Sequence, residues 1–364
     1  METPARASAL RDPEPRFEIR GSMIEDQAQI LAISRHLNTV NLPEEEEGVH
    51  QILEASHKSF TQAIKDPKRR QFVFVLVDRA EDRIIGTSMV FAQLGRRDAP
   101  YIYLDVIDEE RYSQTLDKHF EHTTLKIGYS YNGPTEIGGL VLDPTYRRVP
   151  ERLGTFLSYV RFLFIKMHRE WFRDEVLAEL LPPLEKDGTS HLWDAIGSHF
   201  TGMTYAEADK LSRKNKEFVR GLFPEGTIYA SLLPKDAQSV IGKVGAQTRG
   251  VEKLLRRIGF RYAHRVDPFD GGPHFTAATD EVSLVTSSRR LRVAELLEAE
   301  ALAAVPAEKR KRAVVSVEPS GPPFFRATLA PFEQREGETC ALGAHAAAVL
   351  GLEVGAEAWV LPLE

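Results

Sequence analysis

The sequence has few cysteines and no long apolar run, and both shortages exclude classes of protein. Cys340 is the only cysteine among 364 residues, so no intrachain disulfide can form, which fits a reducing cytoplasm. We find no apolar stretch long enough to span a bilayer, and the N-terminus lacks the apolar core of a signal peptide. We therefore expect a cytoplasmic protein that has no membrane partner.

An excess of positive charge and several catalytic motifs are also missing. The net charge is -6 and the isoelectric point is about 6.1, so the overall charge gives no reason to expect a nucleic-acid partner. There is no Walker loop and no serine-nucleophile motif, and the histidines lack the ligand spacing of a zinc site. We accordingly expect no bound metal.

The length allows two or three domains with a substantial core. We predict a disordered tail over residues 1–15, an N-terminal unit over 16–135 and a second unit over 136–285. A small β-rich subdomain is expected over 286–364. The predicted elements mix helices and strands, so the fold class is α+β.

Local sequence patterns predict three further elements. Phe17–Arg20 is predicted to be an edge strand. Asp174–Leu181 is predicted to be a buried strand that ends at two prolines. Leu291–Ala303 is predicted to be a helix because it is rich in alanine, leucine and glutamate.

The most informative stretch runs from Glu136 to Phe172. It begins with a short apolar strand that contains two adjacent glycines, which favours a bulge or the close approach of a ligand or another backbone. A polar loop follows and then a long amphipathic helix. The loop supplies three cations and a glycine: Arg147, Arg148, Arg152 and Gly154. Because free N–H groups and the helix dipole favour an anion at a helix N-terminus, we interpret this loop as a phosphate-binding site. The alternative is an ordinary solvated basic loop.

This arrangement resembles the pyrophosphate site of the acyl-CoA-dependent N-acyltransferases of the GNAT superfamily. That superfamily usually has Arg/Gln-x-x-Gly-x-Gly/Ala, of which only Gly154 is in place here, in a longer loop. The order of the predicted elements also resembles a GNAT unit, and the second half of the chain repeats the theme. The resemblance implies tandem GNAT-like β-α-β-α units with mixed sheets, followed by the β-rich subdomain.

Several longer runs resemble the bacterial arginine N-succinyltransferase family over roughly Arg16 to Val285. They include EIGGLVLDPTYRR, FRDEVLAEL, IYASLLPKDAQSVIGKV, QTRGVEKLLRRIGFRY and VDPFDGGP. The resemblance implies transfer of succinyl from succinyl-CoA to the α-amino group of L-arginine, in the catabolism of arginine to glutamate and succinate. Succinyl-CoA would be a co-substrate, and no permanently bound cofactor is expected.

Two site residues are carried over from the family. Leu140 matches the position assigned to succinyl-CoA, where a strand offers backbone groups to the pantetheine arm. Glu179 matches a family position at the end of a strand. The α-ammonium of the substrate must lose a proton before it attacks the thioester, and Glu179 is our candidate to hold that ammonium. The alternative is a structural hydrogen-bond acceptor.

The chain departs from the family at two positions. The histidine that the family uses as a proton donor corresponds to Gly245, which has no side chain. A family arginine in the strand after the long helix corresponds to Leu181. His264 and His274 flank the FDGGP turn and are the nearest histidines in sequence. We take His264, with Glu179, as the candidate catalytic pair.

Three interpretations remain open. The protein transfers succinyl to arginine with another acid in place of the family histidine. It uses a different amine or acyl group, which the loss of the arginine at Leu181 favours. It is a non-catalytic CoA-binding subunit, which the loss of the histidine at Gly245 favours. In each case we expect a homo-oligomer or a pairing with a paralogous subunit.

Overall fold

The computed structural model describes residues 15–37, 42–43, 45–185, 188–213, 215–304 and 311–363. The fold is mixed α+β, as predicted. Nearly all of the predicted tail over 1–15 lies outside the described residues. Within the described part, no helix has both the length and the apolar character needed to cross a membrane.

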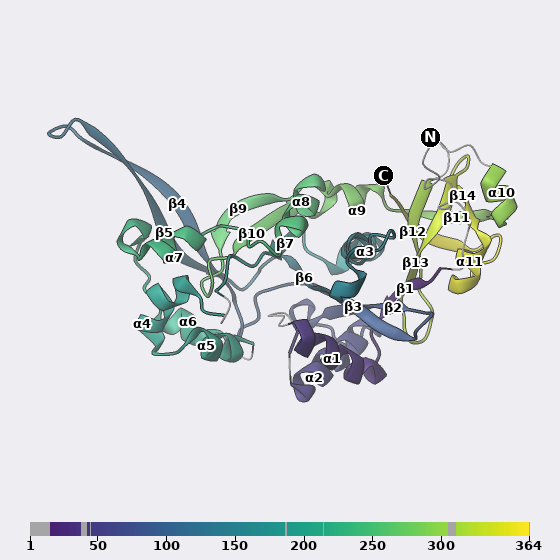
Figure 1. Cartoon of the computed structure of the whole chain (residues 1–364), viewed down its shortest axis with the longest axis horizontal. Helices are drawn as coiled ribbons and strands as arrows, with labels where there is room; N and C mark the ends of the chain where they lie inside the picture. Colours follow the sequence, from purple (N-terminus) through teal and green to yellow (C-terminus); the bar gives the residue numbers. More distant parts are fainter. Residues whose placement is uncertain are drawn as a thin grey trace, which may run out of the picture. The chain divides into compact units, whose positions relative to one another are not determined.

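The described residues group into two compact units, and the chain passes between them four times. Unit 1 takes its residues from Met1–Val90, Gly138–Phe172 and Ser283–Glu364, and unit 2 takes them from Phe91–Ile137 and Arg173–Val282. The domain boundaries expected from the sequence stay a prediction. Figure 1 draws the helices and strands of both units.

Unit 1 contains a sheet in the order β12-β15-β11-β14-β13-β1-β2-β3-β6. Its strands are β1 (Phe17–Gly21), β2 (Gln71–Asp78), β3 (Arg83–Phe91), the end of β6 (Thr135–Leu142), β11 (Arg289–Leu297), β12 (Lys311–Val317), β13 (Arg326–Gln334), β14 (Thr339–Gly343) and β15 (Glu357–Leu363). Its α-helices are α1 (Gln27–Leu37), α2 (Glu46–Phe60), α3 (Leu153–Met167), α9 (Ser283–Ser287), α10 (Ala299–Ala304) and α11 (Ala344–Leu350).

Strands β11 to β15 close into a small barrel, because β12 pairs with β13 as well as with β15. Closure leaves the barrel without a free edge between these two strands. Its interior is apolar and includes Val293, Phe332 and the cysteine, Cys340, which is fully buried. The β-rich subdomain expected from the sequence therefore contains a real core.

Helix α3 is the centre of the rest of unit 1. Most of its residues are buried, on all sides, as expected of a helix in a core rather than on a surface. Phe164 contacts the rings of Phe72 and Phe74, with centroid distances of 4.9 and 5.1 Å. Gly139 in β6 has a φ of 57°, and a Cβ there would lie 2.5 Å from the Met89 side chain, so glycine is required at this position.

Unit 2 contains a sheet in the order β6-β7-β10-β9-β4-β5-β8. Its strands besides the start of β6 are β4 (Tyr101–Ser113), β5 (Lys118–Ser130), β7 (Glu175–Glu179), β8 (Ile228–Tyr229), β9 (Arg261–Val266) and β10 (Pro273–Ala278). Its helices are a π-helical turn (Trp193–Gly197), α4 (Ser198–Thr201), α5 (Tyr205–Ser212), α6 (Glu217–Leu222), α7 (Lys235–Val240) and α8 (Arg249–Arg257). Buried Trp193 stacks on Phe269 at a centroid distance of 5.0 Å.

Strands β4 and β5 extend beyond the rest of the sheet as a two-stranded ribbon, visible in blue in Figure 1. The other neighbours of these strands pair with them only near their bases, at Leu104–Asp105 and at Thr124–Leu125. Most residues between Val106 and Leu125 are exposed. Cross-strand pairing, rather than burial, continues the ribbon.

Two predicted elements were wrong. Leu291–Ala303 is not one helix: β11 occupies Arg289–Leu297, and only α10 is helical. Leu291 and Val293 point into the barrel core while Arg292 is exposed, so burial alternates as in a strand and tertiary pairing overrides helix propensity. Strand β1 is not at an edge, because it pairs with β2 on one side and with β13 on the other.

The buried Asp78 carboxylate ties together three parts of unit 1 that are distant in sequence. It accepts hydrogen bonds from the Arg16 guanidinium at 2.6 Å and from the Tyr146 hydroxyl at 2.9 Å. Its side chain is fully buried. The hydrogen bond from Arg16 is the largest cause that lowers the pKa of Asp78 below its ordinary value. The free energy gained from this network is therefore present at neutral pH and is lost as the pH falls through the lowered pKa.

We predict that Asp78→Asn lowers the free energy of unfolding by roughly 1–3 kcal/mol at pH 7, because it weakens charged hydrogen bonds inside the core. Urea denaturation at a series of pH values measures this. The difference from the unmodified protein should narrow below about pH 4, where the ordinary aspartate is protonated. Glu25→Gln, at an exposed position in the same unit, is the control. A difference that is constant with pH would contradict the assignment.

Candidate functional site

The candidate site is built on the pairing of β7 with β10 in unit 2. The two strands are antiparallel, and their register places His274 opposite Glu179, the last residue of β7. Directly opposed residues of an antiparallel pair point to the same face of the sheet, so the two side chains meet. A hydrogen bond from the Leu180 N–H to the Pro273 carbonyl, at 3.1 Å, continues the pairing past the end of β7.

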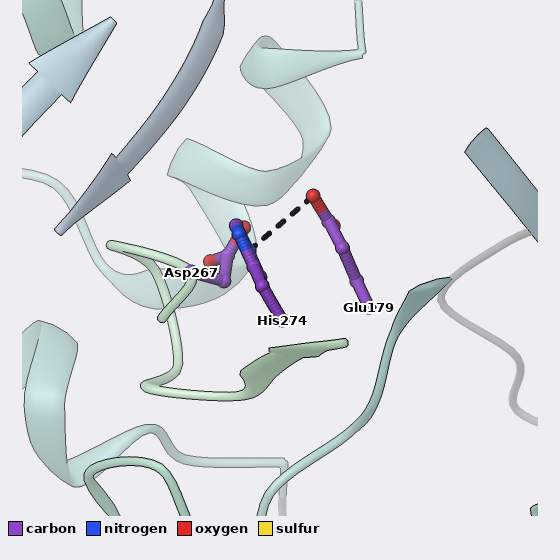
Figure 2. A group of neighbouring side chains, drawn as sticks. All are labelled: Glu179, Asp267 and His274. Carbon is purple, nitrogen blue, oxygen red and sulfur yellow. Dashed lines mark ion pairs between the residues drawn. The ribbon is translucent and has the colours of Figure 1, made fainter. Parts of the chain in front are cut away.

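His274 lies at the centre of a small cluster of polar side chains (Figure 2). Its imidazole is fully buried. Nδ1 lies 2.9 Å from the Tyr101 hydroxyl, and Nε2 lies 3.4 Å from Glu179 Oε1. Asp267 completes the group: one carboxylate oxygen of Asp267, one of Glu179 and a ring nitrogen of His274 all lie within 4.8 Å of one another. The Glu179 side chain is about one third exposed, so the cluster is open to solvent on that side.

The VDPFDGGP turn between β9 and β10 positions Asp267. Its carboxylate accepts hydrogen bonds from the backbone N–H groups of Phe269 and Asp270, at 2.6 and 3.3 Å. Asp270 in turn accepts from the N–H of Gly272 at 2.7 Å. Gly271 has a φ of 80°, which only glycine adopts readily. The turn residues therefore fix one carboxylate of the cluster through backbone geometry.

Negative charge is crowded around this cluster. Burial is the largest cause that raises the pKa of Glu136 to about 8, and the nearby Glu179 raises it further. Burial also raises the pKa of Glu179, and it raises that of Asp267 to about 6. Lys216 is a nearby cation that acts in the opposite direction on all three carboxyl groups. A site of this kind favours a cationic ligand, since a positive charge relieves the repulsion among the carboxylates.

Burial lowers the pKa of His274 to about 4, although Asp267 acts against this shift. The imidazole is therefore neutral at pH 7. A neutral imidazole and two carboxylates suit two kinds of cation. They could hold a protonated amine through hydrogen bonds, or a divalent ion such as zinc by direct ligation. Perturbed titratable groups gathered in one place are typical of functional sites.

The position that corresponds to the family histidine, Gly245, lies against the backbone that follows β7. Its N–H donates to the Leu181 carbonyl at 2.8 Å. A Cβ at Gly245 would lie 2.5 Å from the Pro182 carbonyl oxygen and 3.0 Å from that of Leu181. The Thr248 hydroxyl also donates to the Leu181 carbonyl. The place of the missing side chain is thus taken by backbone, and a histidine cannot be accommodated without moving it.

The residues predicted to bind CoA all lie in unit 1. Leu140 is in β6, and Gly154 is in the first turn of α3. Arg152 precedes this helix with a φ of 55°. Arg147 and Arg148 lie in the loop before it. The three arginines are exposed. Their side chains are therefore free to meet an anion from solvent.

Among the two predicted catalytic residues, the structure places only Glu179 in the cluster. His264 lies on β9, is exposed, and packs its ring near Tyr262 at a centroid distance of 5.0 Å. Sequence reasoning missed the roles of Glu136, Tyr101 and Lys216 in the surroundings of Glu179. The VDPFDGGP run was a usable signal for Asp267. No local pattern signals Tyr101, which joins the cluster through sheet order.

Comparison with solved structures places the fold. The chain superposes on the arginine/ornithine succinyltransferase subunit AI of Pseudomonas aeruginosa with a TM-score of 0.79, and the match covers 96% of this chain and 99% of that one. Sequence identity in this match is 24%, so it establishes the fold alone.

Comparison of sequences places the family. Residues 17–284 match the family described as arginine N-succinyltransferase beta subunit. The chain is 33% identical to the arginine N-succinyltransferase of Yersinia pestis (strain Pestoides F) over 264 residues, which are 72% of this chain and 74% of that protein. It is also 33% identical to that of Salmonella arizonae over 257 residues, 70% and 73% of the two chains. The fold and the sequence define an acyltransferase. The chain belongs to the arginine N-succinyltransferase family.

We predict that Gly245→Ala lowers the free energy of unfolding by roughly 1–3 kcal/mol, because the added methyl group overlaps the carbonyl groups of residues 181 and 182. Chemical denaturation measures the change. Gly250→Ala is the matched control, because no atom of the part of the chain that the structure describes lies within 4 Å of a Cβ at that helical position. This control should raise stability by up to about 1 kcal/mol. Equal stability of the protein with glycine or alanine at 245 would show that the backbone does not close this position.

We also predict that Glu136→Gln reduces the loss of stability between pH 5 and pH 8.5. The pKa of Glu136 is raised to about 8, so the folded state binds more protons than the unfolded state between the ordinary glutamate pKa and 8. Stability therefore falls as the pH rises through this window. Removing one such group should reduce the fall by on the order of 1 kcal/mol or more. Urea denaturation at both pH values, with Glu175→Gln as the control, tests this; an unchanged fall would contradict it.

Proposed function

We propose that this protein transfers the succinyl group of succinyl-CoA to the α-amino group of L-arginine. The observation that carries the proposal is the cluster of Glu179, Asp267 and His274, with Glu136 near enough to interact with Glu179, in a chain of the arginine N-succinyltransferase family. Arginine carries two cationic groups: the α-ammonium, whose nitrogen reacts, and the guanidinium at the end of the side chain. A crowded group of carboxylates suits either of them. Succinyl-CoA acts as a co-substrate, and no permanently bound cofactor is required.

In this proposal Glu179 holds the α-ammonium of arginine and accepts its proton. The Glu179 side chain is about one third exposed, so its carboxylate can meet a ligand from solvent. Burial raises the pKa of Glu179 toward the pKa of an amine, and this smaller difference favours proton transfer. The neutral amine then attacks the thioester carbonyl.

The exposed loop before α3 and the strand around Leu140 are proposed to bind CoA. Arg147, Arg148 and Arg152 supply positive charge, and the first turn of a 15-residue helix supplies free N–H groups. Leu140 offers backbone groups to the pantetheine arm, as the resemblance to the family implies.

We further propose that the two halves of the chain are tandem GNAT-like units with boundaries near residues 135 and 285.

A different amine or acyl group is the second candidate function. Leu181, which stands in place of a family arginine, supports it because a cation is missing from that position. The related structure from Pseudomonas aeruginosa is of an arginine/ornithine succinyltransferase subunit, which makes ornithine the first amine to compare.

A non-catalytic CoA-binding subunit is the interpretation that Gly245 supports. Since that relative is a subunit, we also propose that this protein assembles into a homo-oligomer or with a paralogous chain, in the cytoplasm.

The proposal predicts arginine-dependent release of CoA thiol from succinyl-CoA. Purified protein is mixed with succinyl-CoA and, in turn, L-arginine, L-ornithine and L-lysine, and free thiol is followed with a colorimetric reagent. Glu179→Gln should lower kcat by about 10²–10⁴, the usual contribution of a general base.

Glu175→Gln is the matched control, because it changes an exposed glutamate at the other end of the same strand. It should leave the rate unchanged. Release with ornithine alone would favour the second candidate. No release with any of the three amines, together with measurable CoA binding, would favour a non-catalytic role.

A further inference from the structure

A continuous chain of polar groups links Glu179 to the interior of unit 2. Behind Glu179 lies the imidazole of His274, and behind the imidazole lies the Tyr101 hydroxyl. His274 is fully buried, and Tyr101 is 5% exposed. Nε2 of His274 is buried and has no hydrogen-bond partner of ordinary geometry among the described residues. A buried polar atom left without a partner is costly, so its place beside the carboxylate requires an explanation.

The surroundings of Tyr101 determine which ring nitrogen of His274 carries the proton. Burial raises the pKa of Tyr101 well above its ordinary value, so the hydroxyl keeps its proton. The cationic Arg265 opposes this rise from beside the same hydroxyl, and a guanidinium can only donate. A Tyr101 O–H directed at Nδ1 of His274, at 2.9 Å, leaves the oxygen lone pairs facing this cation, and Nδ1 then accepts. A neutral imidazole has one N–H, which this arrangement puts on Nε2, the nitrogen that faces Glu179 Oε1 at 3.4 Å.

We propose that His274 is the positioning residue of Glu179: its Nε2–H, oriented by Tyr101, holds the carboxylate that receives the proton of the substrate amine. This inference rests on the proposed function and extends it to residues that the family resemblance does not assign. The separation of 3.4 Å is long for a hydrogen bond, as is common in unliganded active sites, where such bonds shorten once a substrate is bound. His274 thus supports proton transfer in a chain in which backbone fills the place of the family histidine at Gly245.

The proton balance of the step is simple. The arginine α-ammonium gives one proton to the Glu179 carboxylate, and the neutral amine adds to the thioester carbonyl. The C–S bond then breaks and the new C–N bond remains. The amine nitrogen loses its second proton, and CoA leaves as the free thiol with one proton. One proton is released to solvent for each turnover. His274 keeps its own proton throughout.

Several other charges face this pair and influence its pH dependence. Glu136 on β6 and Asp267 in the turn after β9 add negative charge. Lys216, before α6, adds positive charge. The cationic Arg265 on β9 further disfavours protonation of the imidazole. Because none of these groups is removed by a substitution at His274, a change in the pH profile of such a variant reports on the imidazole itself.

Two substitutions at the same position separate positioning from packing. The amide of glutamine lies close to the place of Nε2, so His274→Gln keeps a donor beside Glu179. The amide of asparagine lies close to the place of Nδ1, so His274→Asn keeps a partner for Tyr101 and leaves Glu179 without a donor. We expect His274→Asn to lower kcat for arginine by roughly 10- to 100-fold. We expect the acid limb of its kcat/KM profile to move to higher pH, because the carboxylate loses a stabilising donor.

His274→Gln should retain most of the rate and the unmodified pH profile. His199→Asn, at an exposed position in α4, is the control for the loss of a histidine. A merely structural role would lower kcat and the melting temperature alike in both His274 variants with no shift in the pH profile, and this result would overturn the proposal. A large loss with His264→Asn and none with His274→Asn would overturn it in favour of His264.

An independent measurement does not need activity. The ¹⁵N chemical shifts of the His274 ring should show a neutral Nε2–H tautomer that does not titrate between pH 5.5 and 9. Titration within that range, or a proton on Nδ1, would overturn the proposal even if arginine is succinylated. Conversely, an Nε2–H tautomer in a protein that releases no thiol would leave the geometry intact and count against the proposed function alone.

Discussion

The pairing of β7 with β10 is the interaction on which the site depends. It alone places His274 opposite Glu179, because neither residue is near the other in sequence. A shift of one residue in this register would turn every side chain of β10 to the other face and bring Pro273 or Phe275 opposite Glu179. The bond from Leu180 to Pro273 and the tight turn after Asp267 both constrain the strand against such a shift. Backbone geometry therefore determines the chemistry of the side chains.

This arrangement costs stability. The cluster brings carboxyl groups together where burial opposes their ionisation, and one lysine relieves the repulsion only in part. A core built for stability alone would place apolar side chains there. The rest of unit 2 offsets the cost with ordinary packing, such as the stacking of Trp193 on Phe269. Local conflict surrounded by consistent structure is characteristic of sites selected for function.

The sequence supports prediction of the site best where chemistry is local. An apolar run that ends at two prolines predicts strand β7 and its terminal glutamate. Helical periodicity predicts the long helix α3. In the sequence, His274 is distinguished only by its place beside a glycine turn. Its burial has no local signal, because β10 begins with a proline that is typical of a turn. Tyr101 lies in a strand, where a tyrosine is ordinarily a packing residue. Its contact with His274 is separated by 173 residues and depends on the order of strands in the sheet.

The same limit explains the errors in unit 1. Strand β11 contains good helix formers, and only its neighbours β14 and β15 make it a strand. Strand β1 was placed at an edge because its second neighbour, β13, lies near the other end of the chain. Local patterns describe what a segment can do alone. They do not describe which distant segment will cover it.

The pairing of β1 with β13 also has a consequence for the order in which the protein is made. Glu18 and Arg326, which form an ion pair across these strands, are 308 residues apart. At about 5–20 residues per second, a ribosome needs roughly 15–60 s to produce the second after the first. All segments of unit 2 are complete before the last segment of unit 1 emerges. During this time β1 has one open edge, to which another nascent chain can add a strand. Strand β1 thus leaves the ribosome early and is among the last of the described strands to be fully paired.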